Sequence, residues 1–148
     1  TSHANIIIPD DAIRGAYITQ RNSDHYGSLS PFMRAALLGG YTKEGKEWIE
    51  ALMEFSGENE KIVRDFFAEN FPKVHFCRHR AGTLLWADFR EMGTEEEVYA
   101  WFQKAGVEPD LGSKYGEEGR GFLRLQIGMP KRELIYALER IKKAYVKE

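Results

Sequence analysis

The longest stretch of regular hydrophobic spacing lies at residues 42–70. Its apolar residues recur three or four positions apart, which is the period of one face of an α-helix. The phase continues through Gly57, so the pattern predicts one helix of about 28 residues, roughly 42 Å long. The alternative is two helices that meet at Gly57, because glycine inside a helix costs about 1 kcal/mol. In either case Pro72 marks the end of the helical segment.

Shorter elements are predicted before this helix. Residues 4–8 form an apolar run typical of a strand that is buried on both faces of a parallel sheet. Residues 9–11 can stop that strand and cap a helix. Ser30 and Pro31 can open a second short helix, and residues 21–30 are predicted to be an irregular loop. The rest of the chain offers no second strand of this type, which indicates a fragment of a larger sheet or, equally, a processed or trimmed N-terminus.

Beyond Pro72 the pattern changes to short segments of strand and helix. Thr94 and Glu97 form a capping box for one helix, and Pro130 leads a second. Strands are predicted at 74–79, 83–89, 107–111 and 122–127, and the first of the two helices at 94–106. The order β-β-α-β-β-α predicts an α/β fold with a mainly antiparallel sheet and helices on one side. The sequence thus predicts three segments: a loop-rich part at 1–41, a long connecting helix at 42–72 and a compact α/β domain at 73–148.

Composition limits the classes of partner. With 148 residues and 43% hydrophobic content, the chain is long enough to bury a core. The 21 basic and 23 acidic residues are interspersed and give a net charge of -2, which argues against nucleic acid and membrane surfaces as partners. No apolar run approaches the roughly 20 residues that cross a bilayer, and the first residues lack the basic region of a signal peptide. The single cysteine, Cys77, excludes an internal disulfide, so we expect a cytoplasmic protein.

Arg124 is the one charge in the apolar strand predicted at 122–127. A guanidinium that is buried without a partner is costly, so such an arginine usually meets a carboxylate from the protein or from a ligand. Two interpretations remain open: Arg124 binds the carboxylate of a substrate, or it points outward from an alternating strand. Spacing alone favours the outward-facing surface charge.

Two other candidate sites are weaker. His75, Cys77 and His79 alternate on one predicted strand and could bind zinc, but three ligands on one strand span about 13 Å and no second cluster completes the set. No glycine-rich elbow activates the cysteine as a nucleophile. The glycine-rich connection at 112–121 could hold phosphate, but Lys114 precedes the later glycines and two glutamates would repel an anion. A flexible hairpin connection is the better interpretation of 112–121. For the two histidines and the cysteine, a strand edge that faces solvent or an interface is the better interpretation, so no metal site is expected. The carboxylates at 95–97 are explained by favourable charge at a helix N-terminus and need no catalytic role.

Three segments, at 2–9, 81–89 and 121–131, together resemble the pyridoxal-phosphate-dependent class I/II aminotransferases of fold type I. The similarity is greatest to the cystathionine β-lyase (MalY/PatB-type C–S lyase) branch, and it covers essentially the whole chain. It implies that 73–148 is the small C-terminal domain and 1–41 a remnant of the large cofactor-binding domain. Arg124 matches the arginine that holds the α-carboxylate of an amino-acid substrate in this family.

The resemblance also implies what the chain lacks. The Schiff-base lysine is expected upstream of Thr1, so we expect no catalytic residue in this chain and no bound pyridoxal 5′-phosphate. The full-length protein is implied to be a homodimer that uses this cofactor as an aminotransferase or C–S lyase, and self-association of the fragment stays open. Gln126, Met129 and Leu84 depart from the residues common in the family, which leaves lyase and transaminase undecided. The competing hypotheses are a free-standing amino-acid-binding module and a dimerisation module without catalysis.

Overall fold

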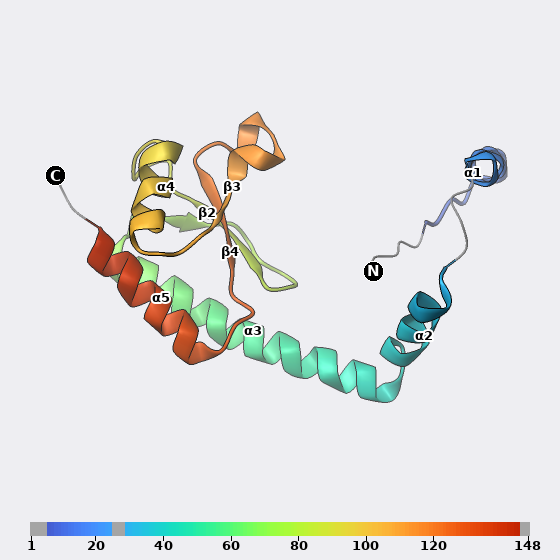
Figure 1. The fold of residues 1–148 in the computed structure, drawn as a ribbon, viewed down its shortest axis with the longest axis horizontal. Coiled ribbons are helices and arrows are strands. Elements are labelled where there is room, and N and C mark those ends of the chain that lie inside the picture. Colours follow the sequence, from blue (N-terminus) through green and yellow to red (C-terminus); the bar gives the residue numbers. More distant parts are fainter. Residues whose placement is uncertain (1–5, 25–28, 146–148) are drawn as a thin grey trace. The chain divides into compact units, whose positions relative to one another are not determined.

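The computed structural model describes residues 6–24 and 29–145. The chain divides into two compact units, Thr1–Ile49 and Glu50–Glu148. Figure 1 shows the elements, which follow in chain order as α1 (Asp11–Ser23), α2 (Pro31–Gly40), α3 (Lys43–Asn70), β1 (His75–Phe76), β2 (Leu84–Asp88), α4 (Glu95–Lys104), β3 (Asp110–Leu111), the 3-10 turns η1 (Gly112–Tyr115) and η2 (Glu117–Gly119), β4 (Phe122–Gln126) and α5 (Lys131–Ala144). Within the described residues, no helix is long and apolar enough to cross a membrane. The division into 1–41, 42–72 and 73–148 stays a prediction.

The described part of the first unit contains α1, α2 and the start of α3. The Asp10 side chain accepts a hydrogen bond from the Ile13 amide and caps α1, and Ser30 caps α2 in the same way. Neither helix contains a buried residue. The strand predicted at 4–8 is wrong where the structure describes it, because residues 6–8 are irregular: a strand needs a neighbouring strand for its backbone hydrogen bonds. The loop predicted at 21–30 is shorter than expected, since α1 continues through Ser23.

Helix α3 confirms the prediction of one uninterrupted helix of 28 residues. Gly57 lies in its interior, so the alternative of two helices is wrong. Further along, Asn59 is fully buried and its side-chain amide donates to the backbone carbonyls of Ile127 and Met129 at 2.7 and 2.8 Å. These bonds attach α3 to the segment that follows the last strand. Val63 and Phe67 then continue the buried face.

The second unit carries an antiparallel sheet of four strands in the order β1-β2-β4-β3. This arrangement confirms the predicted α/β class and the order β-β-α-β-β-α, although β1 and β3 are only two residues long. The predicted capping box is present, with Thr94 and Glu97 bonded reciprocally at the start of α4. Leu85, Ala87 and Leu123 lie on the sheet face that is buried.

One hydrophobic core joins that buried face to the helices of the second unit. In Figure 1, the part of α3 that belongs to this unit lies beside α5. Phe67, Phe89 and Phe102 are fully buried within the core. The indole of Trp101 donates to the Ile141 carbonyl at 2.8 Å and so links α4 to α5. Because helices cover the inner face of the sheet, its outer face is the one that can meet a ligand.

Candidate functional site

Arg124 lies on the outer face of the sheet, opposite the buried core. It stands in the middle of β4, where its neighbour Leu123 points inward and is 1% exposed. The pairing of the strands places Trp86 of β2 directly across from it on one side and Asp110 of β3 on the other. Alternation along the strand therefore produces the outward-facing arginine, and the adjacent strands supply its neighbours.

Asp110 is the carboxylate that meets Arg124. Both Nε and Nη2 of Arg124 donate to the same oxygen, Oδ2 of Asp110, at 3.1 and 2.6 Å. The hydrogen bond from Arg124 is the main reason that the pKa of Asp110 is lowered, while burial opposes the shift. The Arg124 side chain is 32% exposed, so the pair is accessible to solvent and to ligands. The protein partner that an arginine in such a strand requires is thus present.

Aromatic rings lie near the guanidinium on the same face of the sheet, and that of Tyr115 contacts it. The Cζ of Arg124 lies 4.8 Å from the centre of the Tyr115 ring, which is a cation–π distance. Tyr115 also meets the ring of Trp86 edge to face, with centroids 5.6 Å apart. Trp86 in turn stacks on Phe122 at 5.8 Å. Arg124 is therefore flanked by a carboxylate and by flat apolar rings, an arrangement that suits recognition of a small carboxylate with an organic side chain.

Glu95 holds the connection that carries Tyr115. This carboxylate is 6% exposed and accepts hydrogen bonds from the Ser113 hydroxyl at 2.5 Å and from the amides of Ser113 and Gly121 at 3.3 and 3.0 Å. Gly112 and Gly119 approach so closely that a Cβ on Gly112 would lie 1.9 Å from the Gly119 carbonyl oxygen. The glycine-rich connection predicted to be flexible is instead folded into two 3-10 turns that are attached to α4.

Replacing Glu95 with glutamine is expected to lower the free energy of unfolding by about 1 to 3 kcal/mol, because a charged acceptor of three hydrogen bonds is replaced by an amide that satisfies fewer of them. Urea unfolding followed by circular dichroism measures this change. Glu96→Gln is the matched control, since Glu96 follows in the same helical turn but is 76% exposed. A loss in Glu96→Gln as large as in Glu95→Gln would contradict the assigned role.

The same variant should change the dependence of stability on pH. Burial raises the pKa of Glu95, but hydrogen bonds from Ser113 and Gly121 outweigh this effect and hold it below the ordinary value of 4.5. A carboxyl with a lowered pKa in the folded state contributes stability above its unfolded pKa, and that contribution is lost as the pH falls through the folded pKa. Glu95→Gln should therefore lose less stability between pH 6 and pH 3 than the unchanged chain.

A second arginine pair lies on the outer face, at the end of β2. Arg90 donates through Nε and Nη2 to the two oxygens of Asp88, at 2.9 and 2.6 Å, and its Cζ lies 4.8 Å from the Phe122 ring. The Arg90 side chain is 62% exposed, twice as much as that of Arg124. Its hydrogen bond to Asp88 lowers the pKa of that carboxyl. This pair resembles the Arg124 pair closely enough to serve as its control.

The histidines and the cysteine predicted on one strand do not come together. Nε2 of His75 lies 3.7 Å from Glu91, whereas Nδ1 of His79 lies 2.7 Å from Glu60 on α3. Cys77 is exposed. Among the residues that the structure describes, no group of three or more potential ligands could hold a metal ion. The two histidines instead contact glutamates in two different segments of the second unit, the turn after β2 and α3.

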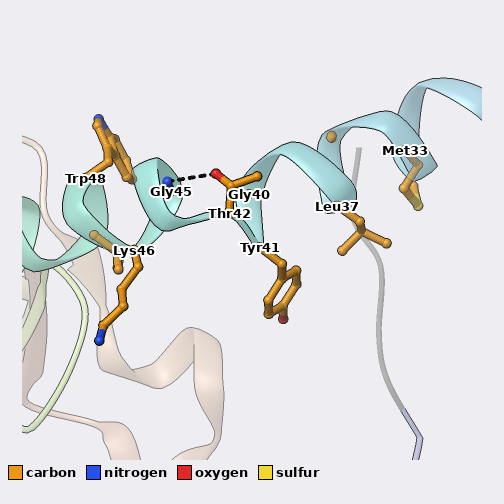
Figure 2. Close-up of a pocket in the computed structure, with 10 residues that line it drawn as sticks. Met33, Leu37, Gly40, Tyr41, Thr42, Gly45, Lys46 and Trp48 are labelled. Carbon is orange, nitrogen blue, oxygen red and sulfur yellow. Dashed lines mark hydrogen bonds between the residues drawn. The ribbon is translucent and has the colours of Figure 1, made fainter.

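An apolar groove lies within the first unit, between α2 and the start of α3. Its volume is about 860 Å³. Figure 2 shows Met33, Leu37 and Tyr41 projecting from one side of α2 and its final turn, and Trp48 on α3. Of the described residues that line it, Lys46 alone is charged. The groove therefore lacks the convergent polar groups that an active site requires.

Sequence reasoning missed Asp110 and Tyr115 as neighbours of Arg124, and it missed the role of Glu95. The signal for Asp110 was available in part, because the segments that became β3 and β4 were both predicted as strands on either side of one connection. Pairing them as a hairpin would have placed an acidic residue near Arg124. Tyr115 and Glu95 could not be found this way, since their positions depend on how the connection folds.

Comparison with known proteins supports the similarity found in the sequence. No protein-family model matches the chain. The chain is 33% identical over 143 residues to cystathionine β-lyase PatB of Bacillus subtilis, covering 94% of this chain and 36% of that protein. It is 30% identical over 134 residues to the protein MalY of Escherichia coli, covering 86% and 33%.

Solved structures give the same result. Cystalysin from Treponema denticola, whose structure contains a pyridoxal 5′-phosphate cofactor, matches with a TM-score of 0.82 and 27% identity over 93% of this chain and 35% of that one. The chain thus spans about a third of the length of these relatives. The comparisons confirm the resemblance predicted from the sequence. This chain matches about a third of the length of pyridoxal-phosphate-dependent aminotransferases and C–S lyases, in the cystathionine β-lyase branch of the family.

Proposed function

We propose that this chain supplies the substrate-carboxylate side of a pyridoxal-phosphate-dependent C–S lyase or aminotransferase that acts on amino acids, with Arg124 binding the α-carboxylate. The observation that carries the proposal is the set of hydrogen bonds made by the Arg124 guanidinium. The guanidinium is held through Nε and Nη2 on the open face of the sheet, and its Nη1 donates to no acceptor among the described residues. A guanidinium that presents a free N–H at a partly exposed site can donate to a ligand carboxylate.

The cofactor would supply the electron sink that stabilises negative charge at the α-carbon of the amino acid. The residues around Arg124 fit the carboxylate of a substrate but not the covalent attachment of the cofactor. Lys114 is the lysine next to this site, and its side chain is 56% exposed with Nζ 3.6 Å from Asp110. A lysine that forms an imine is usually desolvated, whereas Lys114 is exposed and pairs with a carboxylate. We therefore propose that another part of the whole protein provides the lysine and that this chain alone is inactive.

Two further features belong to the proposal. A homodimer is the assembly that the family resemblance implies, and a cytoplasmic location agrees with a single, exposed cysteine. Size-exclusion chromatography with light scattering on the whole protein measures whether it is a dimer.

The test of the activity uses the whole protein, supplied with pyridoxal phosphate. Release of pyruvate and ammonia from cystathionine would support a lyase, and amino transfer to a 2-oxo acid would support an aminotransferase. Binding of amino acids without either reaction would overturn the assignment as an enzyme and favour an amino-acid-binding module. The 148-residue chain alone is expected to show neither turnover nor a lasting change in the absorption band of added cofactor.

A further inference from the structure

We infer that Asp110 is a positioning residue for Arg124, which fixes the guanidinium from its side so that the end bearing Nη1 stays open for the carboxylate of a ligand. The inference rests on the proposed function, in which Arg124 binds the α-carboxylate. It goes beyond that function because it assigns to Asp110 a task that is carried out through Arg124.

The geometry of the pair shows whether Asp110 positions Arg124 or occupies the edge that a ligand carboxylate would use. A guanidinium offers a side edge, formed by Nε and Nη2, and an end edge, formed by Nη1 and Nη2. Asp110 uses the side edge, and it does so through Oδ2 alone. Its other oxygen, Oδ1, lies 3.6 Å from the Nζ of Lys114. A carboxylate that competed with the substrate would be expected at the end edge, with both of its oxygens on Arg124.

Tyr115 restrains the guanidinium in the remaining direction. The Cζ of Arg124 lies over its ring, 4.8 Å from the centroid. The backbone of Asp110 pairs with Arg124 in the sheet, and Ser113, two residues before Tyr115, is bound to the buried Glu95. These contacts limit the movement of both residues. An exposed arginine normally loses side-chain entropy when it binds a ligand. Restraint in the unbound protein removes part of that cost.

Positioning and competition predict opposite results for the same variant. If Asp110 positions Arg124, Asp110→Asn should weaken carboxylate binding, because a charged acceptor that orients the guanidinium is lost. If Asp110 competes with the substrate, the same change should strengthen binding.

The first experiment measures positioning in the 148-residue chain, without any enzymatic activity. The chain is labelled with ¹⁵N-arginine, and the Nε–Hε signal of Arg124 is assigned by its loss in Arg124→Lys. We expect slow exchange of this proton with solvent in the unchanged chain and faster exchange in Asp110→Asn. Glu117→Gln is the matched control, since Glu117 accepts from the Nε of Arg120 at 2.9 Å in the same connection. Equal exchange of the Arg124 proton with and without Asp110 would overturn the inference.

The second experiment measures the consequence in the whole protein. Asp110→Asn should raise KM for an α-amino acid by roughly two- to tenfold, with a smaller change in kcat. It should leave kcat/KM for the carboxamide of the same amino acid unchanged, because the carboxamide lacks the charge that Arg124 binds. Asp110→Glu should restore part of the loss, and Glu117→Gln should cause none.

The two experiments keep the inference separate from the proposed function. A lower KM in Asp110→Asn would identify Asp110 as a competitor and overturn positioning. An equal loss for the amino acid and its carboxamide would assign Asp110 a purely structural role, which also overturns it. If exchange of the Arg124 proton depends on Asp110 but Arg124→Ala has no effect on catalysis, the proposed function fails, and positioning toward a substrate fails with it.

Discussion

Arg124→Ala in the whole protein is expected to lower kcat/KM for α-amino acids by roughly tenfold to a hundredfold, the largest catalytic effect expected of any residue in this chain. The change removes charge-assisted hydrogen bonds to the substrate. It also removes the arginine that neutralises Asp110, whose remaining cationic partner is Lys114 at 3.6 Å, so an anionic carboxylate stays beside the site that the substrate carboxylate must enter. The double variant Arg124→Ala with Asp110→Asn should therefore recover part of the activity that Arg124→Ala loses. Initial rates across substrate concentrations, measured for all three variants, give both comparisons.

Arg90→Ala is the control for this prediction. Arg90 has the same kind of carboxylate partner and the same aromatic contact, but it is more exposed and both oxygens of Asp88 are bonded to it. Its removal should leave kcat/KM within about twofold of the unchanged protein, as expected for a surface ion pair. An unchanged kcat/KM in Arg124→Ala, or an equal loss in both variants, would refute the assignment of the carboxylate to Arg124.

The long helix shows which features can be predicted from local sequence. Its apolar phase is continuous, and the structure has one helix with the predicted length. The cost of Gly57 was a local reason to divide it, but one unfavourable residue does not outweigh a face that buries Val63 and Phe67. The caps of α1, α2 and α4 were predictable for a similar reason, since a capping side chain bonds to a backbone amide only three residues away.

The environment of Arg124 could be predicted only in part from local sequence. Alternation along β4 allowed an outward arginine, and the structure shows one, but spacing could not name its partner. The register that sets Asp110 opposite Arg124 depends on the fold of the connection between β3 and β4. That fold depends in turn on Glu95, which accepts a hydrogen bond from Gly121, 26 residues away. Contacts between distant segments are invisible in a pattern read one window at a time.

The three neighbouring glutamates at the start of α4 have different roles that the local sequence did not distinguish. One rule, favourable negative charge at a helix N-terminus, explained all of them in the sequence. In the structure they differ: Glu95 is buried, Glu96 is exposed near Arg120, and Glu97 completes the capping box with Thr94. Only the capping role was predictable, because it depends on spacing within the helix. The direction in which Glu95 points is set by the connection that packs against it.

The largest loss of stability is expected for Phe67→Ala, at about 3 to 5 kcal/mol. Phe67 is fully buried, and its ring lies 5.5 to 5.8 Å from those of Phe71, Phe76 and Phe89. It therefore joins α3 to the first strands of the sheet that carries Arg124. Alanine would leave a cavity where helix and sheet meet, and the free energy of unfolding of such a domain is only about 5 to 15 kcal/mol. Urea unfolding, followed by the near-ultraviolet signal of the tryptophans, measures the change.

Phe32→Ala separates this packing effect from the loss of any aromatic ring. Phe32 lies on α2 and is 86% exposed, so its removal should change the free energy of unfolding by less than about 0.5 kcal/mol. If Phe67→Ala cost no more than Phe32→Ala, the sheet would not depend on α3 for its support. In that case the exchange of the Arg124 Nε proton should also be the same in Phe67→Ala as in the unchanged chain. If α3 does support the sheet, destabilising it should accelerate that exchange, because local opening exposes Arg124 and Asp110 to solvent together.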